Sequence, residues 1–457
     1  MSNKTLVMRG SAREFNGFSA VDVVDLHAGC DTRSTPVFSL SHKARLLSLC
    51  GCLLPLSAQA GFFQDSHLTM EARNFYLNRD FRDSDKSDVP RFKGQPKNKL
   101  EDWGQGFIMR YESGFTPGPI GFGVDGMGLL GIKLDSGAGT SGSGALPRNP
   151  ITGEVPDEFS FFGWTGKAKV SQSTLTVGTH LPTLPVVYYN DTRMLPQTFF
   201  GAQLLSKDIR NMTVLGGQFR KTRLRDSTNY EDMTMFSDRS TGGMPSDHFN
   251  YGGLTYTWSP KLSASYFYGE LENNYKQHYI GLLSTLPLTE SLKFKSDLRY
   301  FISDDDGRST VDNRTAQAML TLLYRGHALG GGYVWQTGDT GMPFIAGGTN
   351  AYTINLATYH HFLRAHEDSW QVRYDYDFAP LGLPGLTFMA RYMRGSDFQI
   401  GNQNANEWER DVDISYVVQS GLLKDLNLRW RNLSYRSSNT TDLDENRLIV
   451  SYTFKFW

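Results

Sequence analysis

Apolar and polar side chains alternate along most of the chain after residue 60. The clearest case is the segment 371–378. Its apolar face carries Val372, Tyr374, Tyr376 and Phe378, and its polar face carries Gln371, Arg373, Asp375 and Asp377. Similar alternation occurs at 68–76, 412–418 and 447–456. A period of two places alternate residues on opposite faces of a β-strand, and no helical period persists here. The pattern therefore predicts an all-β protein.

Clusters of Gly, Asn, Asp, Pro and Ser separate these segments and predict turns in a long series of hairpins. A β-sandwich could show the same alternation, but it needs a second sheet to cover its apolar face. With about 22 residues for each strand and its loop, residues 61–457 provide about 18 strands, within the size range of barrels that enclose an aqueous channel. The favoured fold is a transmembrane, antiparallel, up-and-down β-barrel.

The start of the chain has the order of a secretory signal peptide. A charged stretch at 42–45 precedes an apolar run at 46–57, and Ala58-Gln59-Ala60 provides a small-residue cleavage site. The run is too short to span a bilayer as a helix, which needs about 20 residues. We therefore expect a prefix and signal peptide at 1–60, cleavage after Ala60, and a barrel domain at 61–457. The stretch before residue 41 is unusually long for a signal peptide and suggests a start codon assigned too far upstream.

A lipoprotein signal is the alternative for this region, because Leu49-Cys50-Gly51-Cys52 resembles a lipobox. The apolar run continues to Leu56, beyond those cysteines, which favours ordinary cleavage. All three cysteines precede residue 61. The mature protein would therefore have no disulfide bond and no thiolate metal site.

Composition agrees with a barrel. A mean hydropathy of -0.40 resembles that of a soluble protein, but a membrane barrel shows only alternate side chains to lipid. The aromatic fraction of 13% is enough for two girdles at the membrane interfaces. A net charge of -1 provides no basic excess for nucleic acid, so that class of partner is excluded.

Six stretches of the chain resemble the porin D (OprD) family of substrate-specific outer-membrane channels of Gram-negative, Pseudomonas-like bacteria. They are RNFYLNRDFR at 73–82, GFGVDGMGLLGIKLDSG at 121–137, LPQTFFGAQL at 195–204, SWQVRYD at 369–375, GLPGLTFMARY at 382–392 and YVVQSGLLKDLNLRWR at 416–431. The resemblance covers essentially all of 61–457. It implies an 18-stranded barrel, an inward-folded third loop that narrows the lumen, and packing as a homotrimer.

The resemblance also implies a row of basic side chains that leads carboxylate-bearing solutes, such as amino acids and aromatic or other organic acids, through the lumen. An arginine facing lipid at mid-bilayer would cost about 2–4 kcal/mol, so lumen arginines belong on the polar phase of a strand. Five arginines meet this condition: Arg73, Arg373, Arg391, Arg429 and Arg431. Guanidinium groups bind carboxylates in bidentate fashion, so a row of them would guide anions. The alternative is that they pair with lumen carboxylates such as Asp375 and Asp377 and only hold the wall together.

By the same resemblance, the segment 182–197 is the constriction loop. Its three prolines would stiffen irregular backbone. Asp191 and Arg193 are its charged members and the candidates for a selectivity filter, unless the segment is an ordinary surface loop with solvated charges. Three further residues, Lys293, Lys295 and Arg299, occupy the polar phase of another strand. They would either extend the basic wall or only line it.

Two motifs suggest metal sites, but only weakly. Asp304-Asp305-Asp306-Gly307 resembles part of a calcium loop, without the spaced ligands and closing Glu of that motif. His360 and His361, taken as adjacent strand residues, would point to opposite faces. We expect neither a metal nor a cofactor.

Two other classes of function remain open. Members of the resembled family have been classed among serine peptidases, but this chain has no Gly-x-Ser-x-Gly elbow and offers no identifiable catalytic triad. An adhesin-like barrel would have a blocked lumen. The expected partners are small solutes, outer-membrane lipid and lipopolysaccharide, and the barrel-assembly machinery, which recognises a terminal aromatic residue such as Trp457. The apolar face of the last strand runs through Phe456 instead, so this terminal signal is imperfect.

Overall fold

The computed structural model describes residues 59–83, 86, 88–347, 350–438 and 440–457. They belong to one compact unit, Ser57–Trp457. The suggested lipobox and the apolar run of the signal peptide lie outside the described residues. The short helix α1 (Gln59–Gln64) begins next to the predicted cleavage site. No helix of the described residues is long and apolar enough to cross a membrane.

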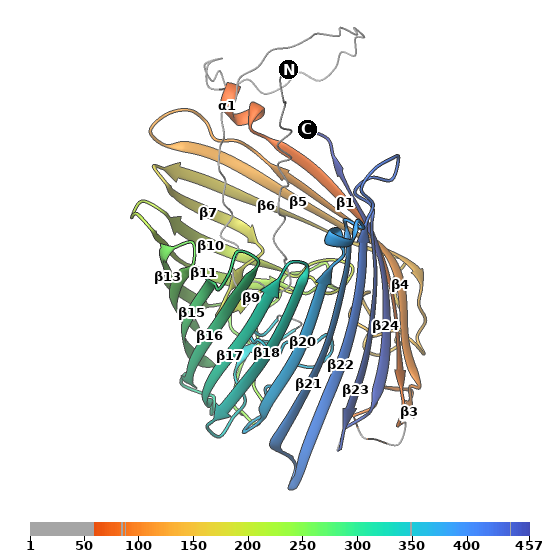
Figure 1. Ribbon diagram of the computed structural model, residues 1–457. Coiled ribbons are helices and arrows are strands. Elements are labelled where there is room, and N and C mark those ends of the chain that lie inside the picture. The colour runs from red at the N-terminus through yellow and green to blue at the C-terminus, as the bar shows by residue number, and fades with distance from the viewer. Residues whose placement is uncertain (1–58, 84–85, 87, 348–349, 439) are drawn as a thin grey trace, which may run out of the picture. The chain divides into compact units, whose positions relative to one another are not determined.

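Eighteen antiparallel strands form one closed sheet, which confirms the predicted barrel (Figure 1). They are β1 (His67–Phe81), β4 (Lys99–Glu112), β5 (Gly121–Asp135), β6 (Glu158–Val170), β7 (Ser173–His180), β10 (Thr198–Ser206), β11 (Met212–Arg223), β13 (Phe249–Ser259), β14 (Leu262–Leu271), β15 (Tyr275–Pro287), β16 (Leu292–Asp305), β17 (Asp312–Tyr324), β18 (His327–Thr337), β20 (Asp368–Asp377), β21 (Leu386–Ile400), β22 (Gln403–Val417), β23 (Asn427–Ser437) and β24 (Leu443–Lys455). Closure occurs at β1, which pairs with both β4 and β24.

The two ends of the barrel differ. One end carries α1, the C-terminus and short connections, and we call it the turn end. A short 3-10 helix, η2 (Ala379–Leu381), lies in one of these connections. Trp457 attaches the C-terminus to the start of β1, because its carbonyl oxygen accepts a hydrogen bond from Leu68 N at 3.3 Å and its Nε1 donates to Ser66 Oγ at 3.1 Å. The opposite end carries the long connections, and we call it the loop end. Its first loop contains the hairpin β2 (Arg91–Phe92) and β3 (Gln95–Pro96).

Three long loops from the loop end are joined to one another. We name them L3 (181–197), L4 (224–248) and L7 (338–367). L3 contains the hairpin β8 (Thr183–Leu184) and β9 (Val187–Tyr188), while β12 (Met235–Phe236) of L4 pairs with β19 (Phe344–Ile345) of L7. An isolated bridge between Tyr188 and Asn350 joins L3 to L7. The narrowing of the barrel therefore involves three loops, of which the sequence predicted only L3.

Glycines on the inner wall make room for L3. Met194 and Leu195 of L3 are fully buried and pack in an apolar cluster with Phe75 and Ile108 of the wall. A Cβ atom on Gly106 of β4 would lie 2.9 Å from Met194 Cγ and 3.0 Å from the Met194 carbonyl oxygen. A strand glycine often marks such a close approach of a second backbone segment. Gly106 therefore allows L3 to lie directly on the wall.

Replacing Gly106 by leucine is expected to displace L3 and to destabilise the barrel by about 1–3 kcal/mol, the usual cost of overpacking. The readouts are the urea midpoint of unfolding and the rate of proteolysis within 181–197. Gly126→Leu is the matched control, because a Cβ on Gly126 meets only Phe162, at 3.6 Å. Equal midpoints and equal proteolysis of the two variants would contradict this account of L3.

Candidate functional site

L3 is attached to the inner wall by charged groups. Arg73 of β1 binds both carboxylate oxygens of Asp191, at 2.6 and 3.2 Å, and donates to the Arg193 carbonyl oxygen at 3.0 Å. Its Nε donates to Glu71 at 2.8 Å. The Asp191 side chain keeps 31% of its surface exposed. L3 is thus no surface loop with solvated charges, and two of the residues singled out from the sequence, Arg73 and Asp191, form one site.

Arg429 and Arg431 of β23 share one carboxylate. Arg429 donates to both oxygens of Asp413 at 2.6 to 2.9 Å, and Arg431 Nε donates to Asp413 Oδ2. Two guanidinium groups on one carboxylate leave an excess of one positive charge. The Arg429 side chain is 36% exposed, so it remains accessible from inside the barrel.

The remaining two arginines of the predicted row are also paired. Arg373 binds Asp375 of its own strand through two contacts of 2.7 Å. Arg391 binds Asp411 at 2.6 Å and donates to the Leu356 carbonyl oxygen of L7 at 2.8 Å. All five arginines thus have carboxylate partners, as the structural alternative predicted. Whether the wall attracts anions therefore depends on the local balance of charge.

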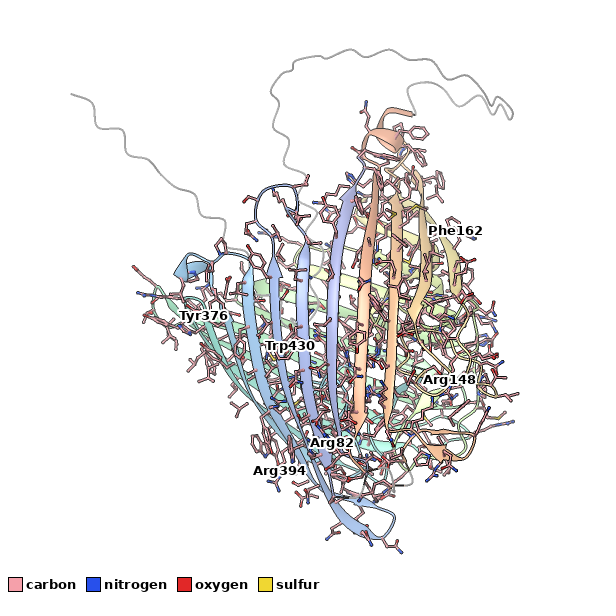
Figure 2. The ribbon with its side chains drawn as sticks, turned by 90° about the vertical axis from the view of Figure 1, so that its right-hand side faces the viewer. Arg82, Arg148, Phe162, Tyr376, Arg394 and Trp430 are labelled. Atoms are coloured by element: carbon pink, nitrogen blue, oxygen red, sulfur yellow. The ribbon has the colours of Figure 1, made fainter. Side chains whose placement is uncertain are left out.

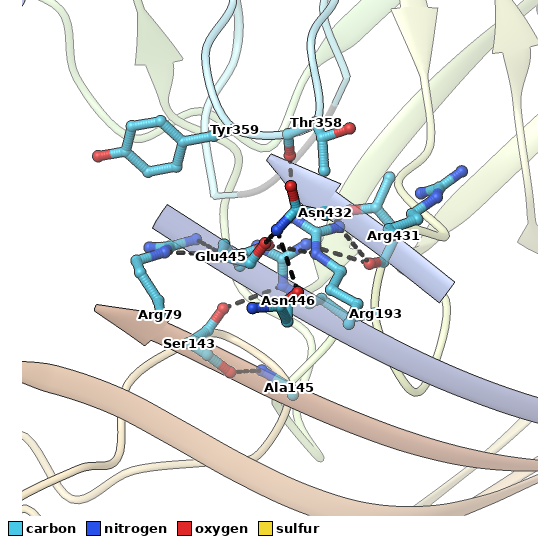
Figure 3. Close-up of polar contacts among 12 residues, drawn as sticks. Arg79, Ser143, Ala145, Arg193, Thr358, Tyr359, Arg431, Asn432, Glu445 and Asn446 are labelled. Carbon is cyan, nitrogen blue, oxygen red and sulfur yellow. Dashed lines mark hydrogen bonds and ion pairs between the residues drawn. The ribbon is translucent and has the colours of Figure 1, made fainter. Parts of the chain in front are cut away.

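That balance is most positive around Glu445 of β24. Glu445 is fully buried and binds Arg79, at 2.6 Å, and Arg447. Arg447 also donates to the Thr192 carbonyl oxygen of L3 at 3.3 Å, and Thr192 Oγ1 accepts from Arg225 of L4 at 3.1 Å. In Figure 3, Arg79 and Arg193 flank Glu445.

Arg193 completes this group. Its guanidinium donates to Ser143 O at 3.0 Å and to Thr192 O at 3.1 Å. Among the described residues, neither Arg193 nor Arg225 has a carboxylate within ion-pair distance. We name Arg79, Arg193, Arg225, Arg447 and Glu445 the central cluster. It brings four guanidinium groups to one carboxylate.

The pKa values of the two loop arginines, Arg193 and Arg225, are both lowered. Burial, followed by the charges of Arg447 and Arg225, lowers the pKa of Arg193 well below its ordinary value. Burial lowers the pKa of Arg225 to about 10, with the charge of Asp226 opposing the shift and smaller effects of Arg447 and Arg79 adding to it. A guanidinium group keeps its positive charge at neutral pH. An anion entering the central cluster would therefore be stabilised by charges that are incompletely neutralised.

Sequence reasoning missed much of this cluster, although part of the signal was present. Arg447 lies on the polar phase of an alternating segment, and Arg79 shares the phase of Arg73, so the test that selected Arg73 would also have selected both. Arg225 lies in L4 and has no periodic signal. Its position depends on contacts between loops that are distant in sequence.

The register of the wall orders these groups. Arg79 lies opposite Glu445, Arg447 opposite Arg431, and Arg429 opposite Ile449, one step further toward the turn end each time. On the same inner face, Arg373 lies opposite Arg391, which lies opposite Asp411. Inward arginines thus occur on β20 and β21 and again on β23, β24 and β1, and the carboxylates of β22 lie between the two groups.

Carboxylates on β22 hold L7 against the wall. Glu407, Glu409, Asp411 and Asp413 alternate along the strand and are all buried on the inner face. Glu409 accepts backbone N–H groups from Tyr359 at 2.8 Å and His360 at 2.9 Å. Asp411 accepts the N–H of Thr358 at 3.3 Å. The alternation was visible in the sequence, but its role was not.

Reading His360 and His361 as strand neighbours is wrong, because both lie in L7. Loop backbone follows no alternation of faces. His360 Nδ1 lies 2.9 Å from Glu407, and its ring stacks on Tyr435. Among the described residues, no group of three or more His, Cys, Asp or Glu side chains could hold a metal ion.

The aspartates at 304–306 form ion pairs. Asp304 binds Arg314 and Asp306 binds Lys276, each at 2.7 Å. These pairs account for two of the three carboxylates in the suggested calcium-loop fragment.

Arg299 belongs to the opposite wall. It binds Asp297 at 2.7 Å and lies 4.1 Å from the ring centre of Tyr352 in L7. Lys293 and Lys295 lie nearer the turn end of the same strand, and within the described part of the chain neither has a carboxylate at ion-pair distance. The three residues therefore differ in character, because only the lysines retain uncompensated charge.

A buried pair of acids lies beneath L7. Glu367 is fully buried beside Gly395 of β21, and its carboxyl lies within hydrogen-bond reach of Glu407. Arg364 and His360 of L7 and Tyr435 of β23 also contact Glu407. Burial, and then the charge of Glu407, raise the pKa of Glu367 well above its ordinary value.

We expect L7 to loosen as the pH rises. Because the pKa of Glu367 is higher in the folded than in the unfolded chain, its contribution to stability is complete below the ordinary carboxyl pKa and is lost as the pH rises through the folded value. Single-channel recordings should show more frequent current transitions as the pH rises through that folded pKa, and Glu367→Gln should abolish this dependence. If Glu367→Gln kept the wild-type pH profile, the pH dependence of the current transitions would have to come from a group other than Glu367.

Comparisons with known proteins agree with this geometry. The family model described as "outer membrane porin, OprD family" matches residues 60–456. The porin-like protein GalP of Pseudomonas putida is 38% identical over 406 residues, which cover 87% of this chain and 94% of GalP. Two solved Pseudomonas aeruginosa structures each overlap 87% of this chain and 100% of their own. OpdQ is 45% identical with a TM-score of 0.79, and OpdK, solved with vanillate, is 35% identical with a TM-score of 0.79. The named relatives are porins and not enzymes. The chain therefore belongs to the OprD family of substrate-specific porins of the bacterial outer membrane.

Proposed function

We propose that this porin is selective for small solutes that carry a carboxylate, including amino acids and aromatic or other organic acids. The observation that carries the proposal is the central cluster, where four guanidinium groups lie around one carboxylate that is paired with only two of them, Arg79 and Arg447. A solute carboxylate would complete the pairing of Arg225, which is only partly buried, through charge-assisted contacts, and the buried Arg193 would add its positive charge behind that contact. OpdK, a relative of this chain, was solved with vanillate, an aromatic carboxylate.

The order of the arginines supports a path through the lumen. A carboxylate released from the central cluster would next meet Arg431 and Arg429, which share Asp413. Passage requires each contact to be weak enough to break, and the shared carboxylates provide that competition. Lys293 and Lys295 offer further positive charge nearer the turn end. We assign a positioning role to Arg391, because its side chain is almost fully buried between Asp411 and L7.

Processing and assembly are a second part of the proposal. Mature protein beginning at Gly61 would retain the last turn of α1, where Asp65 N donates to Gly61 O at 3.2 Å, and its contact with the barrel, where Gly114 N donates to Phe62 O at 2.9 Å. Mass measurement of exported protein would test cleavage after Ala60. A homotrimer and recognition of Trp457 by the assembly machinery remain predictions from the sequence.

Single-channel recording in planar bilayers tests the carboxylate proposal. Vanillate added to the loop side should block the wild-type current transiently, while the uncharged analogue vanillyl alcohol should not. Each charge-assisted hydrogen bond contributes about 1.5–3 kcal/mol, so Arg193→Gln with Arg225→Gln should weaken the block by at least about tenfold.

Arg210→Gln is the matched control, because Arg210 is exposed in the turn between β10 and β11. It should leave the block unchanged. If vanillate and the alcohol blocked the current equally, the channel would not select carboxylates. If the double variant and the wild type were blocked equally, the central cluster would not be the source of that selectivity. A barrel without measurable conductance would refute passage itself.

A further inference from the structure

Arginines interrupt the outer face of the barrel near the loop end of β21, β22 and β23. The outer faces of β21 and β22 are apolar nearer the turn end, where Ala390 lies opposite Val412, and become aromatic at Tyr392 and Trp408. On β23, Trp430 lies opposite Ile414, nearer the turn end than this aromatic level. Short turns lie on the periplasmic side of such barrels and long loops on the extracellular side, so this aromatic level belongs to the outer leaflet. Figure 2 shows Arg394 and Arg82 beyond Trp430, away from α1.

Strand register gathers three arginines around one tryptophan. Trp408 lies opposite Arg394 of β21 and opposite Arg436 of β23. Arg410 is two residues from Trp408 on the same strand and lies opposite Tyr392 and Ser434. Diagonal neighbours on one face of a sheet are about 7–8 Å apart, which a single phosphate group and its substituents can bridge.

Two of these arginines lack a carboxylate partner. Arg410 donates only to neutral groups, Asn432 Oδ1 at 2.5 Å and Ser434 Oγ at 3.0 Å. Arg394 has no ion pair among the described residues. The nearest acids along the sheet bind elsewhere, since Asp397 accepts from Ser396 at 2.7 Å and Asp368 accepts from Tyr333 at 3.0 Å. Both arginine side chains are exposed.

Other outward-facing arginines of the strands are neutralised. Arg220 binds Asp247 at 2.8 Å, Arg314 binds Asp304 at 2.7 Å, and Arg436 binds Asp444 at 2.9 Å. Uncompensated positive charge on the outer wall is therefore concentrated at Arg394 and Arg410. Arg436 contributes a paired charge and lies 5.8 Å from the Trp408 ring centre.

We propose that Arg394, Arg410 and Trp408 form a binding site for a phosphate group of an outer-leaflet glycolipid. Guanidinium groups bind phosphate oxygens in bidentate fashion and are only weakly hydrated, which suits them to a membrane boundary. A lipid is the ligand, because acyl chains of a molecule held here would lie along Ala390, Val412 and Ile414 on the same face. The site lies on the outside of the wall and is separate from the lumen and its solutes.

Native mass spectrometry of the refolded protein in neutral detergent tests the site, with bisphosphorylated lipid A as the probe. Basic side chains at a membrane surface each contribute measurably to anionic lipid binding, so Arg394→Gln with Arg410→Gln should raise the lipid dissociation constant by at least about tenfold. Lipid A without its phosphates should bind the wild type as weakly as the intact lipid binds the double variant. Single-channel conductance of the variant should match the wild type, which verifies folding.

Arg314→Gln is the matched control, since Arg314 is also an outward-facing strand arginine but has carboxylate partners. It should bind lipid A as the wild type does. Equal affinity of the double variant and the wild type would overturn the proposal. Displacement of the lipid by equimolar inorganic phosphate would also overturn it, because the site would then recognise the free ion. A wild-type dimer that excludes lipid from this face would assign the surface to a second copy of the chain instead.

Discussion

Glu445→Gln is expected to destabilise the folded barrel by about 3–5 kcal/mol, the usual cost of removing one partner from a buried ion pair. The variant would leave Arg79 and Arg447 without a carboxylate in a fully buried setting, next to Arg193 and Arg225. Repulsion among four guanidinium groups should also displace L3, because Arg447 donates to the Thr192 carbonyl oxygen. Urea unfolding in lipid vesicles, followed by tryptophan fluorescence, measures the free energy.

Glu101→Gln is the control for this variant. Glu101 is partly exposed on the outer side of β4 and pairs with Lys99, an arrangement that contributes little to stability. Ion selectivity gives a second readout, since the loss of one negative charge should make any folded Glu445→Gln channel more anion-selective. An unchanged midpoint together with unchanged selectivity would show that Glu445 does not neutralise the central cluster.

Alternation along the strands made most of the wall predictable. A strand that is covered by lipid on one face and faces water on the other must keep its phase, so Arg73, Arg373 and Arg391 could be placed inside from the sequence alone. Their pairing was not predictable to the same degree. Arg373 meets Asp375 two residues away on its own strand, a local contact, whereas Arg391 meets Asp411 on the neighbouring strand and could equally have met another carboxylate of β22.

The loops were less predictable, because no periodic constraint acts on them. L3 was placed inside by resemblance, and Asp191 indeed lies against the wall. L4 and L7 carry Arg225, His360 and Glu367. Arg225 contacts L3, whereas His360 and Glu367 contact Glu407 of β22. Such contacts join residues far apart in sequence, and they were inaccessible to reasoning from alternation. The error over His360 and His361 has this origin, since strand geometry was assumed for loop backbone.

Glu409→Leu is expected to release L7 from the wall. The carboxylate accepts two backbone N–H groups of L7, and hydrogen bonds to a charged group contribute about 1.5–3 kcal/mol each. Without it, both N–H groups would lie unpaired against an apolar side chain, so the segment 358–360 should lift away. Single-channel recordings should then show more frequent current transitions and a larger mean conductance, because L7 bridges to L3 through Asn350.

Ser415→Val is the matched control, since Ser415 lies on the same face of β22 nearer the turn end and donates to Asn427 instead. If the Glu409→Leu current were as quiet as that of the control, L7 would be held chiefly by its contacts with L3 and L4, and the carboxylates of β22 would serve only to pair the arginines.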